Sequence, residues 1–242
     1  MNAPALRVRS IGEILDMAFQ LYRAHMVPIV TATGLFILPI LLLQVVVPEE
    51  FLSVVDRVSN IFFMAASAAV VLIASEGYMG RQLDGVTAVK RVNGRFMSVW
   101  GAAIIQGLMI GIGLLLLVIP GLIAAAWTFG MQQAVMIEGR KANDSFERSR
   151  DLARGNLMHV LLTAVMTLVI TFVAVIGVMV VLGYVFTGTR SLNIVSTLVM
   201  ILLNPLAAVV NTVLYYDLRI RKEGYDVQVY TERMDAGVPV AG

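Results

Sequence analysis

The residues that could carry chemistry are few, and most of them stand at the ends of long apolar segments. Glu76 and Glu138 each close an uncharged run, His25 stands at the mouth of another, and His159 lies just inside a fourth. Carboxylates and imidazoles can bind metals or move protons, but two histidines without further ligands do not make a metal site. We therefore expect both glutamates to form ion pairs at helix ends. The sequence predicts no catalytic residue, no metal ligand and no cofactor.

Uncharged polar residues inside the apolar segments are better candidates for a specific role. Gln106, Asn204 and Asn211 each need a hydrogen-bond partner, because an unpaired amide is costly in hydrocarbon. Two interpretations stay open: the amides bond between helices, or they line a substrate cavity. The pair Asn204-Pro205 also predicts a kink, because proline removes a helical hydrogen bond.

Small residues recur at every fourth position of one apolar segment, at Ala103, Gly107 and Gly111. This spacing places them on one face of a helix, where small side chains let a second helix approach closely. The pattern predicts a helix-packing face. It does not say whether the partner is internal, a second copy or another membrane protein.

The whole composition requires a membrane. Hydrophobic residues make up 59% of the 242 and charged residues only 14%, and the mean hydropathy is +0.85. Cysteine is absent, so disulfides and thiolate sites are excluded. The uncharged block 96–137 is about twice the length of one crossing, so it must cross twice, and Pro120-Gly121 predicts the break. The predicted spans are 26–47, 58–75, 96–119, 122–137, 157–186 and 194–216.

Charge placement predicts the orientation of these six spans. Of the 18 Lys and Arg, all but Arg57 and Arg190 fall on the side that holds both termini. Because positive residues accumulate on the cytoplasmic side of a membrane, we expect both termini in the cytoplasm. Residues 1–226 then form one six-span domain, and residues 227–242 a flexible cytoplasmic tail. The partner expected first is the lipid bilayer, and no nucleic acid is expected.

Three amphipathic segments precede the three pairs of spans. Ser10 and Glu13 have the spacing of a capping box and start the first segment; basic segments at 86–95 and 144–154 precede the other pairs. The fold class predicted is an all-α integral membrane protein with six transmembrane helices. We interpret it as three repeats, each a cytoplasmic amphipathic helix followed by a membrane hairpin.

Three parts of the chain resemble a known family. They are SIGEILDMAFQLYRAH, then PGLIAAAWTFGMQQAVMIEG followed by SFERSRDLARGN, and LYYDLRIRKEGYD. They are similar to the membrane domain of bacterial glycerophosphoryl diester phosphodiesterases, which also occurs alone in inner-membrane proteins. The resemblance extends to about Asp226. It implies a bacterial inner-membrane location but no phosphodiesterase activity, because the family's catalytic barrel has no counterpart among these residues.

The last of these segments carries a charged ending that could fasten the cytoplasmic side together. We expect an acidic residue of this ending to pair with arginines of the connector before the fifth span. The acidic candidates and their helix neighbours are Asp217, Arg219, Arg221 and Glu223, and the connector arginines are Arg148, Arg150 and Arg154.

Two functions remain open at this point. The first is a non-enzymatic accessory or organising protein that binds lipids, another membrane protein or itself. The second is a small transporter or lipid-handling protein, which requires a cavity between spans that touches Asn204, Asn211 or Gln106. An enzyme acting on membrane lipids is a more distant third.

Overall fold

The structure is a computed structural model that describes residues 6–235. Within these residues the chain forms only helices, namely twelve α-helices and one short 3-10 helix. The helices are α1 (Ile11–Ala24), α2 (Met26–Val46), η1 (Glu49–Phe51), α3 (Leu52–Tyr78), α4 (Gly85–Asn93), α5 (Phe96–Leu116), α6 (Val118–Thr128), α7 (Met131–Glu138), α8 (Ala142–Ala153), α9 (Leu157–Val185), α10 (Thr189–Leu203), α11 (Pro205–Glu223) and α12 (Tyr225–Asp235).

Six stretches of helix in the described residues are long and apolar enough to cross a membrane. They are α2, η1 with α3, α5, α6 with α7, α9, and α10 with α11. The sequence prediction of six apolar helices is therefore confirmed at the level of length and composition. Asn204 keeps helical dihedrals, so α10 and α11 follow each other with only a local interruption at Pro205.

The amphipathic helix α1 begins as its capping box predicts. Ser10 accepts a hydrogen bond from the Glu13 amide, and the Glu13 carboxylate accepts one from the Ser10 amide at 2.8 Å. This backbone hydrogen bond, with further help from Arg7, lowers the pKa of Glu13 from its ordinary 4.5 to about 2. The start of α1 is thus set by local chemistry.

The break between the third and fourth apolar helices differs from the sequence prediction. It lies at Leu117, which is extended, and not at Pro120-Gly121. Proline is tolerated in the first turn of a helix, where its missing amide has no intrahelical acceptor, so Pro120 helps to begin α6. Gly113 and Gly121 face each other across the hairpin, and a Cβ on Gly113 would lie 2.8 Å from the Gly121 Cα.

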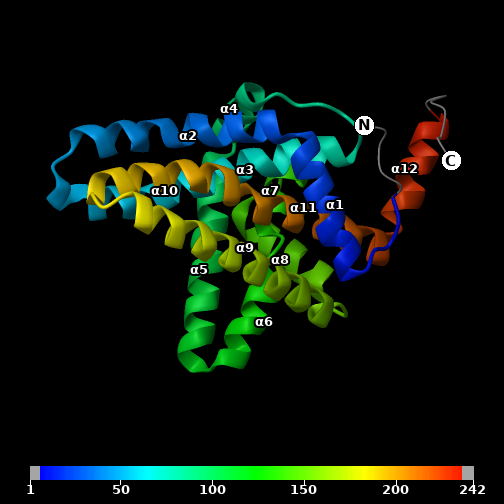
Figure 1. Ribbon diagram of the computed structural model, residues 1–242. Helices are drawn as coiled ribbons and strands as arrows, with labels where there is room; N and C mark the ends of the chain where they lie inside the picture. The colour runs from blue at the N-terminus through cyan, green and yellow to red at the C-terminus, as the bar shows by residue number, and fades with distance from the viewer. Residues whose placement is uncertain (1–5, 236–242) are drawn as a thin grey trace.

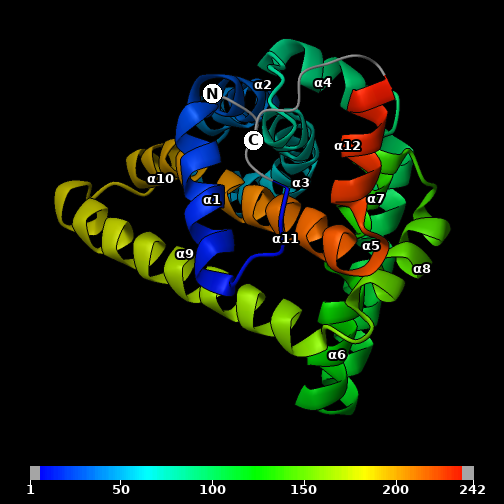
Figure 2. The same cartoon turned by 90° about the vertical axis from the view of Figure 1, so that its right-hand side faces the viewer.

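The hairpins α2–α3 and α9–α10 extend from the centre of the molecule in one direction, and the hairpin α5–α6 extends in another. In Figure 1 the tips of α2–α3 and α9–α10 point to the left, whereas α5–α6 points down. Figure 2 shows α2 and α3 nearly end-on while α9 runs across the view. The helices α10 and α2 pack together, but the tip of α5–α6 projects from the rest.

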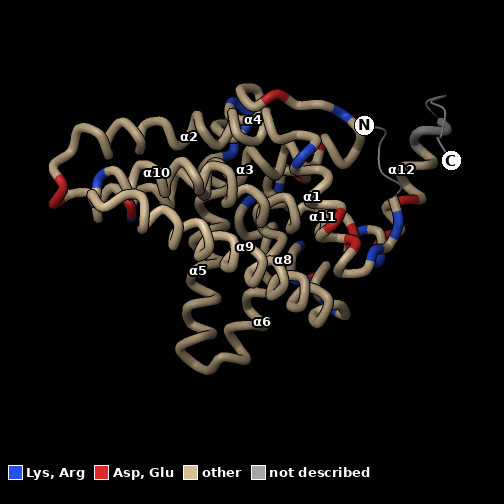
Figure 3. The backbone as a smooth tube through the Cα atoms, viewed as in Figure 1, with Lys and Arg blue, Asp and Glu red and all other residues tan. Residues whose placement is uncertain are grey.

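The short helices α1, α4 and α8 each pack against a different hairpin. Helix α4 contacts α2 and α3, α8 contacts α5, α6 and α7, and α1 contacts α9 and α11. Each of α4 and α8 therefore lies on the hairpin that precedes it in the chain, and α1 lies on the last one. Charged residues gather around these short helices and the end of α11, and the α5–α6 hairpin has none (Figure 3).

The C-terminal part of the chain begins with a helix where the sequence predicts a flexible tail. Gly224 adopts the left-handed conformation that ends α11, and α12 follows over Tyr225–Asp235. The predicted tail 227–242 therefore starts inside α12. Val229 of this helix is buried against the core, and this contact holds the helix on the rest of the molecule. The remaining residues, 236–242, lie outside the described part.

Candidate functional site

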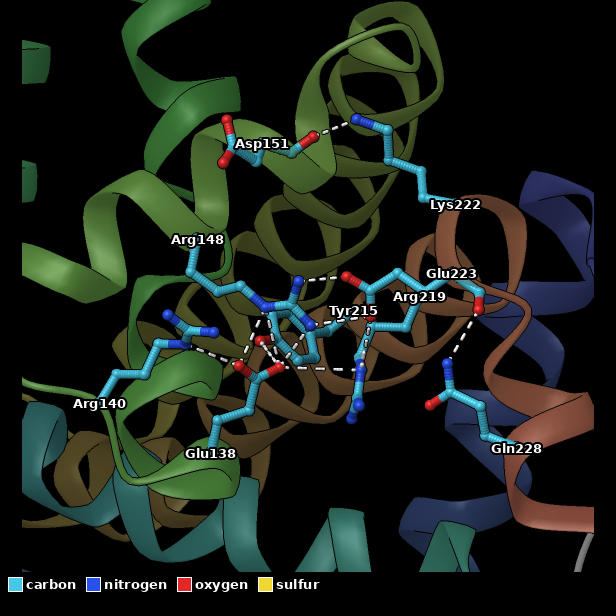
Figure 4. Close-up of polar contacts among 9 residues, drawn as sticks. All are labelled: Glu138, Arg140, Arg148, Asp151, Tyr215, Arg219, Lys222, Glu223 and Gln228. Carbon is cyan, nitrogen blue, oxygen red and sulfur yellow. Dashed lines mark hydrogen bonds and ion pairs between the residues drawn. The ribbon is translucent and has the colours of Figure 1, made fainter. Parts of the chain in front are cut away.

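Two carboxylates and one arginine join three helices at the charged end of the molecule (Figure 4). Arg148 of α8 donates from Nη2 to Glu138 at 2.7 Å and to Glu223 at 2.9 Å, and from Nε to Glu138 at 2.9 Å. Glu138 is the last residue of α7 and Glu223 the last of α11. We call Glu138, Arg148, Tyr215, Arg219 and Glu223 the Arg148 clamp. It makes the pairing of Arg148 with Glu223 that the sequence predicts.

The other members of the Arg148 clamp add contacts to the same carboxylates. The Tyr215 hydroxyl donates to Glu138 at 2.7 Å, and the Arg219 Nε lies 3.4 Å from Glu223. Arg140, just outside the clamp, donates to Glu138 at 2.8 Å. The hydrogen bonds to Glu223 and Glu138 raise the pKa of the Arg148 guanidinium above its ordinary range. Several cations therefore share two carboxylates, and the network does not depend on any single pair.

Asp217 does not pair with the connector arginines, which corrects one of the two pairings proposed from the sequence. Asp217 and Glu223 are six positions apart, and at 3.6 residues per turn they point to different faces of α11. Only Glu223 faces α8. Arg150 instead stacks over the Trp127 ring, with its Cζ 5.9 Å from the ring centroid, and Arg154 lies 3.6 Å from Asp151 of its own helix.

Asp217 instead binds the segment before α1 and the start of α9. Its carboxylate accepts from the Arg9 amide at 2.6 Å and the Arg221 Nε at 2.7 Å, and it lies 3.1 Å from His159 Nε2. We call Asp217, Arg9, Arg221 and His159 the Asp217 anchor. Arg221 also donates to the Arg9 carbonyl at 2.5 Å. The anchor fastens three separate parts of the chain on one buried carboxylate.

A polar pocket of about 590 Å³ adjoins the Arg148 clamp. Its wall includes Glu138 and Arg219 of the clamp, and also the ends of α3 and α4 and the turn that precedes α5. The charged residues that line it are Glu76, Arg81, Arg91, Arg95, Glu138 and Arg219. We call this the end pocket. Ion pairs of Glu76 with Arg81 and of Glu138 with Arg140, expected from the sequence, both form beside it.

The polar residues predicted inside the apolar helices lie in three separate places. Asn211 lines a cavity of about 380 Å³ beside α9, and Gln106 lines one of about 150 Å³ that also contains Gln132. Asn204 is exposed and lines none of the described cavities. Two other glutamines of the apolar helices do bond between helices: Gln132 donates to the Ser67 hydroxyl at 2.7 Å, and Gln44 donates to the Thr197 hydroxyl at 2.9 Å.

The predicted helix-packing face has no partner within the described chain. Gly107 and Gly111 are exposed, and a Cβ added at either would meet nothing within 4 Å. Ala103 is half-buried and lines the small cavity with Gln106. The residue of α5 that does approach another helix closely is Gly113, which faces Gly121 of α6. The four-residue spacing was therefore no guide to the internal contact, because Gly113 belongs to another face of the same helix.

Comparison with known protein families matches residues 43–218 to a family described as a domain of unknown function, DUF7847. The chain belongs to this family. No curated protein and no solved structure matches it. The DUF7847 region contains Glu138, Arg148, Tyr215 and Asp217, and it ends before Arg219 and Glu223.

Proposed function

We propose that this member of the DUF7847 family is a non-enzymatic, multi-pass protein of the bacterial inner membrane that binds membrane lipid. The six long apolar helices support the membrane location. The gathering of Lys and Arg around α4, α8 and the end of α11 supports a cytoplasmic position for that end (Figure 3). Helix α9, with 29 residues, would be roughly 43 Å long, so it fits a bilayer only as a tilted span.

The single observation that carries lipid binding is an open apolar groove between α9 and α11. The cavity of about 380 Å³ is lined by apolar side chains of both helices together with Asn211 and Thr171. A second cavity of about 180 Å³, closed by Leu15 and Phe19 of α1, shares Thr167 with the first. We infer that the two cavities, which meet at Thr167, act as one groove, of a size and polarity that suit an acyl chain.

Two polar groups in the groove suggest how its occupant is oriented. In the described part of the chain the buried Thr171 hydroxyl has no hydrogen-bond partner, and an unpaired buried hydroxyl is costly. The half-buried Asn211 amide lines the same cavity. The Asn211 amide could bond an ester oxygen of a glycerolipid whose chains lie against α9, and the Thr171 hydroxyl would have to turn towards the groove to do the same. This is the lipid-handling alternative that the sequence left open.

The experiment that tests lipid binding is native mass spectrometry of the protein extracted in polymer nanodiscs. We expect one lipid to remain bound to the wild type and to be lost from Ala207→Trp, which fills the groove. Leu202→Trp is the matched control, because Leu202 is exposed and lies outside the groove. Equal lipid retention by the two variants would overturn the proposal.

A second candidate, an accessory subunit for another membrane protein, is favoured by the exposed face of α5. Gly107 and Gly111 stand on a hairpin that projects from the molecule, where a partner helix could approach closely. The resemblance to membrane domains fused to phosphodiesterases favours the same function. We expect Gly107→Leu to release any co-purified protein in stoichiometric amount, and Gly177→Leu, on exposed α9 surface, to retain it.

Complete crossing by all three hairpins is part of this proposal, and the direction of α5–α6 makes it testable. The chain has no cysteine, so single cysteines can be labelled without background. In intact cells we expect an impermeant thiol reagent to label Leu117→Cys and Glu50→Cys, but not Gln82→Cys. Protection of Leu117→Cys from both sides would show that α5–α6 enters the membrane without crossing it.

The three-repeat architecture is proposed on the order and packing of the helices. Each unit would be a short helix followed by a hairpin: α1 with α2–α3, α4 with α5–α7, and α8 with α9–α11. The short helix of each unit packs on the hairpin of the unit before it, and α1 packs on that of the last unit. This cyclic exchange is what three related units around one axis would produce.

A further inference from the structure

We propose that the end pocket binds a phosphate-bearing anion. Four arginines from separate elements line it: Arg81 follows α3, Arg91 lies on α4, Arg95 precedes α5 and Arg219 lies on α11. Guanidinium groups bind phosphate oxygens through paired hydrogen bonds in a fixed planar geometry. These four arginines come together only in the folded chain, where they line one cavity and can bind the same anion.

The two carboxylates in the wall leave the pocket with an excess of positive charge. Glu138 is already bonded by Arg148, Arg140 and the Tyr215 hydroxyl, none of which lines the pocket. Glu76 accepts from the Arg81 Nε at 2.5 Å. Arg91 also lies 3.5 Å from Glu76, and Arg219 lies 3.7 Å from Glu138, so the arginines share the two carboxylates. Four arginines against two carboxylates leave the wall with a formal excess of two positive charges, which a phosphate with one or two negative charges would balance.

Several donors in the wall are free for an anion. Among residues 6–235, the Nη atoms of Arg219 and the Nη2 of Arg95 donate no hydrogen bond. Arg91 lies 3.5 Å from Glu76, at the limit of a hydrogen bond. The hydroxyls of Ser75 and Tyr216 bond to each other at 2.7 Å, so whichever accepts keeps its own proton to donate. These donors surround one cavity.

Aromatic packing and helix capping hold the arginines in place before any ligand arrives. The Arg219 Cζ lies 3.8 Å from the centroid of the Tyr225 ring, a close cation-π contact. Arg95 donates to the carbonyls of Val135 and Met136 at the end of α7. A guanidinium held in this way loses little conformational entropy when it binds, which favours a specific site over a diffuse basic surface.

The volume indicates a ligand larger than inorganic phosphate alone. About 590 Å³ accommodates a phosphate with an attached glycerol or a similar polar group. The ligand could be a soluble phosphate ester or the headgroup of an anionic lipid, since both present the same phosphate chemistry. The end pocket shares no lining residue with the groove beside α9, so this site can be tested independently of the proposed lipid groove.

The test compares two neighbouring residues of α4. Arg91→Gln removes a pocket arginine, and Lys90→Gln removes the same charge from an exposed side chain that does not line the pocket. The full chain in nanodiscs of zwitterionic lipid is titrated with glycerol phosphate, and separately the nanodiscs are doped with phosphatidylglycerol. Binding is read from the rise in melting temperature, with sodium chloride at equal ionic strength as the reference. We expect Arg91→Gln to weaken binding about tenfold and Lys90→Gln by less than about twofold.

Each outcome decides the proposal. Stabilisation by glycerol phosphate that depends on Arg91 assigns a soluble ester, and stabilisation only by phosphatidylglycerol that depends on Arg91 assigns a lipid headgroup. No stabilisation by either ligand, or equal losses in Arg91→Gln and Lys90→Gln, would overturn the site. Arg219→Lys provides a second reading, because it keeps the charge and loses the planar fork. It should reduce the rise in melting temperature that the ligand produces, measured against the ligand-free variant, because the loss of its clamp contact with Glu223 also changes the ligand-free value.

Discussion

The Asp217 anchor and the Arg148 clamp share helix α11, but they differ in how deeply their carboxylates are buried and in how many carboxylates they contain. The anchor gathers two cationic or polar side chains and a backbone amide on one carboxylate that is 0% exposed. In the clamp, Glu138 and Glu223 are 15% and 29% exposed and share Arg148, with Arg219, Arg140 and Tyr215 as further partners. The anchor has a single, fully buried acceptor for all its donors, whereas the clamp has two partly exposed acceptors that share their donors.

This difference determines how each site should respond to the loss of one residue. Removing the fully buried Asp217 carboxylate leaves the buried Arg9 segment without its acceptor at a point that water does not reach, although Arg221 is 26% exposed. Removing one partner from a partly exposed network lets the remaining partners and water take its place. We therefore expect the anchor to determine whether the chain folds, and the clamp to determine how firmly α7, α8 and α11 are held together.

The largest effect is expected from Asp217→Ala. The substitution leaves Arg221, His159 and the Arg9 amide without their common acceptor, at a cost of about 3–5 kcal/mol in the free energy of unfolding. Denaturant unfolding in detergent micelles measures it. Asp217→Asn keeps one carbonyl acceptor and should lie between the wild type and Asp217→Ala. A smaller loss for Asp217→Ala than for any clamp variant would contradict the comparison.

Arg148→Met should destabilise the protein less, although it removes the central residue of the clamp. Methionine keeps the apolar stem, and Arg140, Arg219 and Tyr215 still compensate Glu138, so we expect a loss of about 2 kcal/mol. The matched control is Arg150→Met, which removes an arginine of the same helix from the Trp127 ring and should cost about 0.5 kcal/mol. Equal losses would show that the clamp adds nothing specific.

Glu223→Gln tests the clamp through one of its acceptors, whereas Arg148→Met removes a donor. Its side chain is 29% exposed, and glutamine can still accept from Arg148, so the expected loss is about 1 kcal/mol. Because an exposed ion pair is screened by salt, the difference from wild type should shrink between 50 mM and 1 M salt. A loss that does not change with salt would place Glu223 in the same class as Asp217.

The parts of the fold that the sequence predicted well are those set by neighbouring residues. Uncharged runs located the six apolar helices, and the spacing of Ser10 and Glu13 located the start of α1. The break at Leu117 was missed because proline signals both the end of one helix and the first turn of the next. The direction of the α5–α6 hairpin was also beyond the sequence, since it depends on packing between distant segments.

The candidate site was predictable only where helix periodicity applies. The sequence offered both Asp217 and Glu223 as partners for the connector arginines. Their positions are six apart, so they lie on different faces of α11, and this spacing alone predicts that only one of them can face α8. The roles of Arg9 and Tyr215 could not be found in the same way, because their partners Asp217 and Glu138 lie 208 and 77 positions away along the chain. The end pocket likewise combines α3, α4, α7 and α11, which no local pattern relates.

The smallest effect concerns the capping box, which holds α1 next to the anchor and is far from the clamp. Because the pKa of Glu13 is lowered to about 2 from 4.5, its stabilising contribution is present above about pH 4.5 and is lost as the pH falls towards 2. The Glu13 side chain is 42% exposed and, among the described residues, bonds only to Ser10 and Arg7, so the effect should be confined to the first turn of α1 and the adjoining Arg9 segment. Glu13→Gln should abolish this pH dependence. Hydrogen exchange of the amides from Arg9 to Ile14, corrected for intrinsic rates, measures this loss. We expect the protection of these amides to fall between pH 4.5 and 3 while the protection of α8 stays constant. A parallel fall in α8 would mean that the anchor and the clamp are not independent.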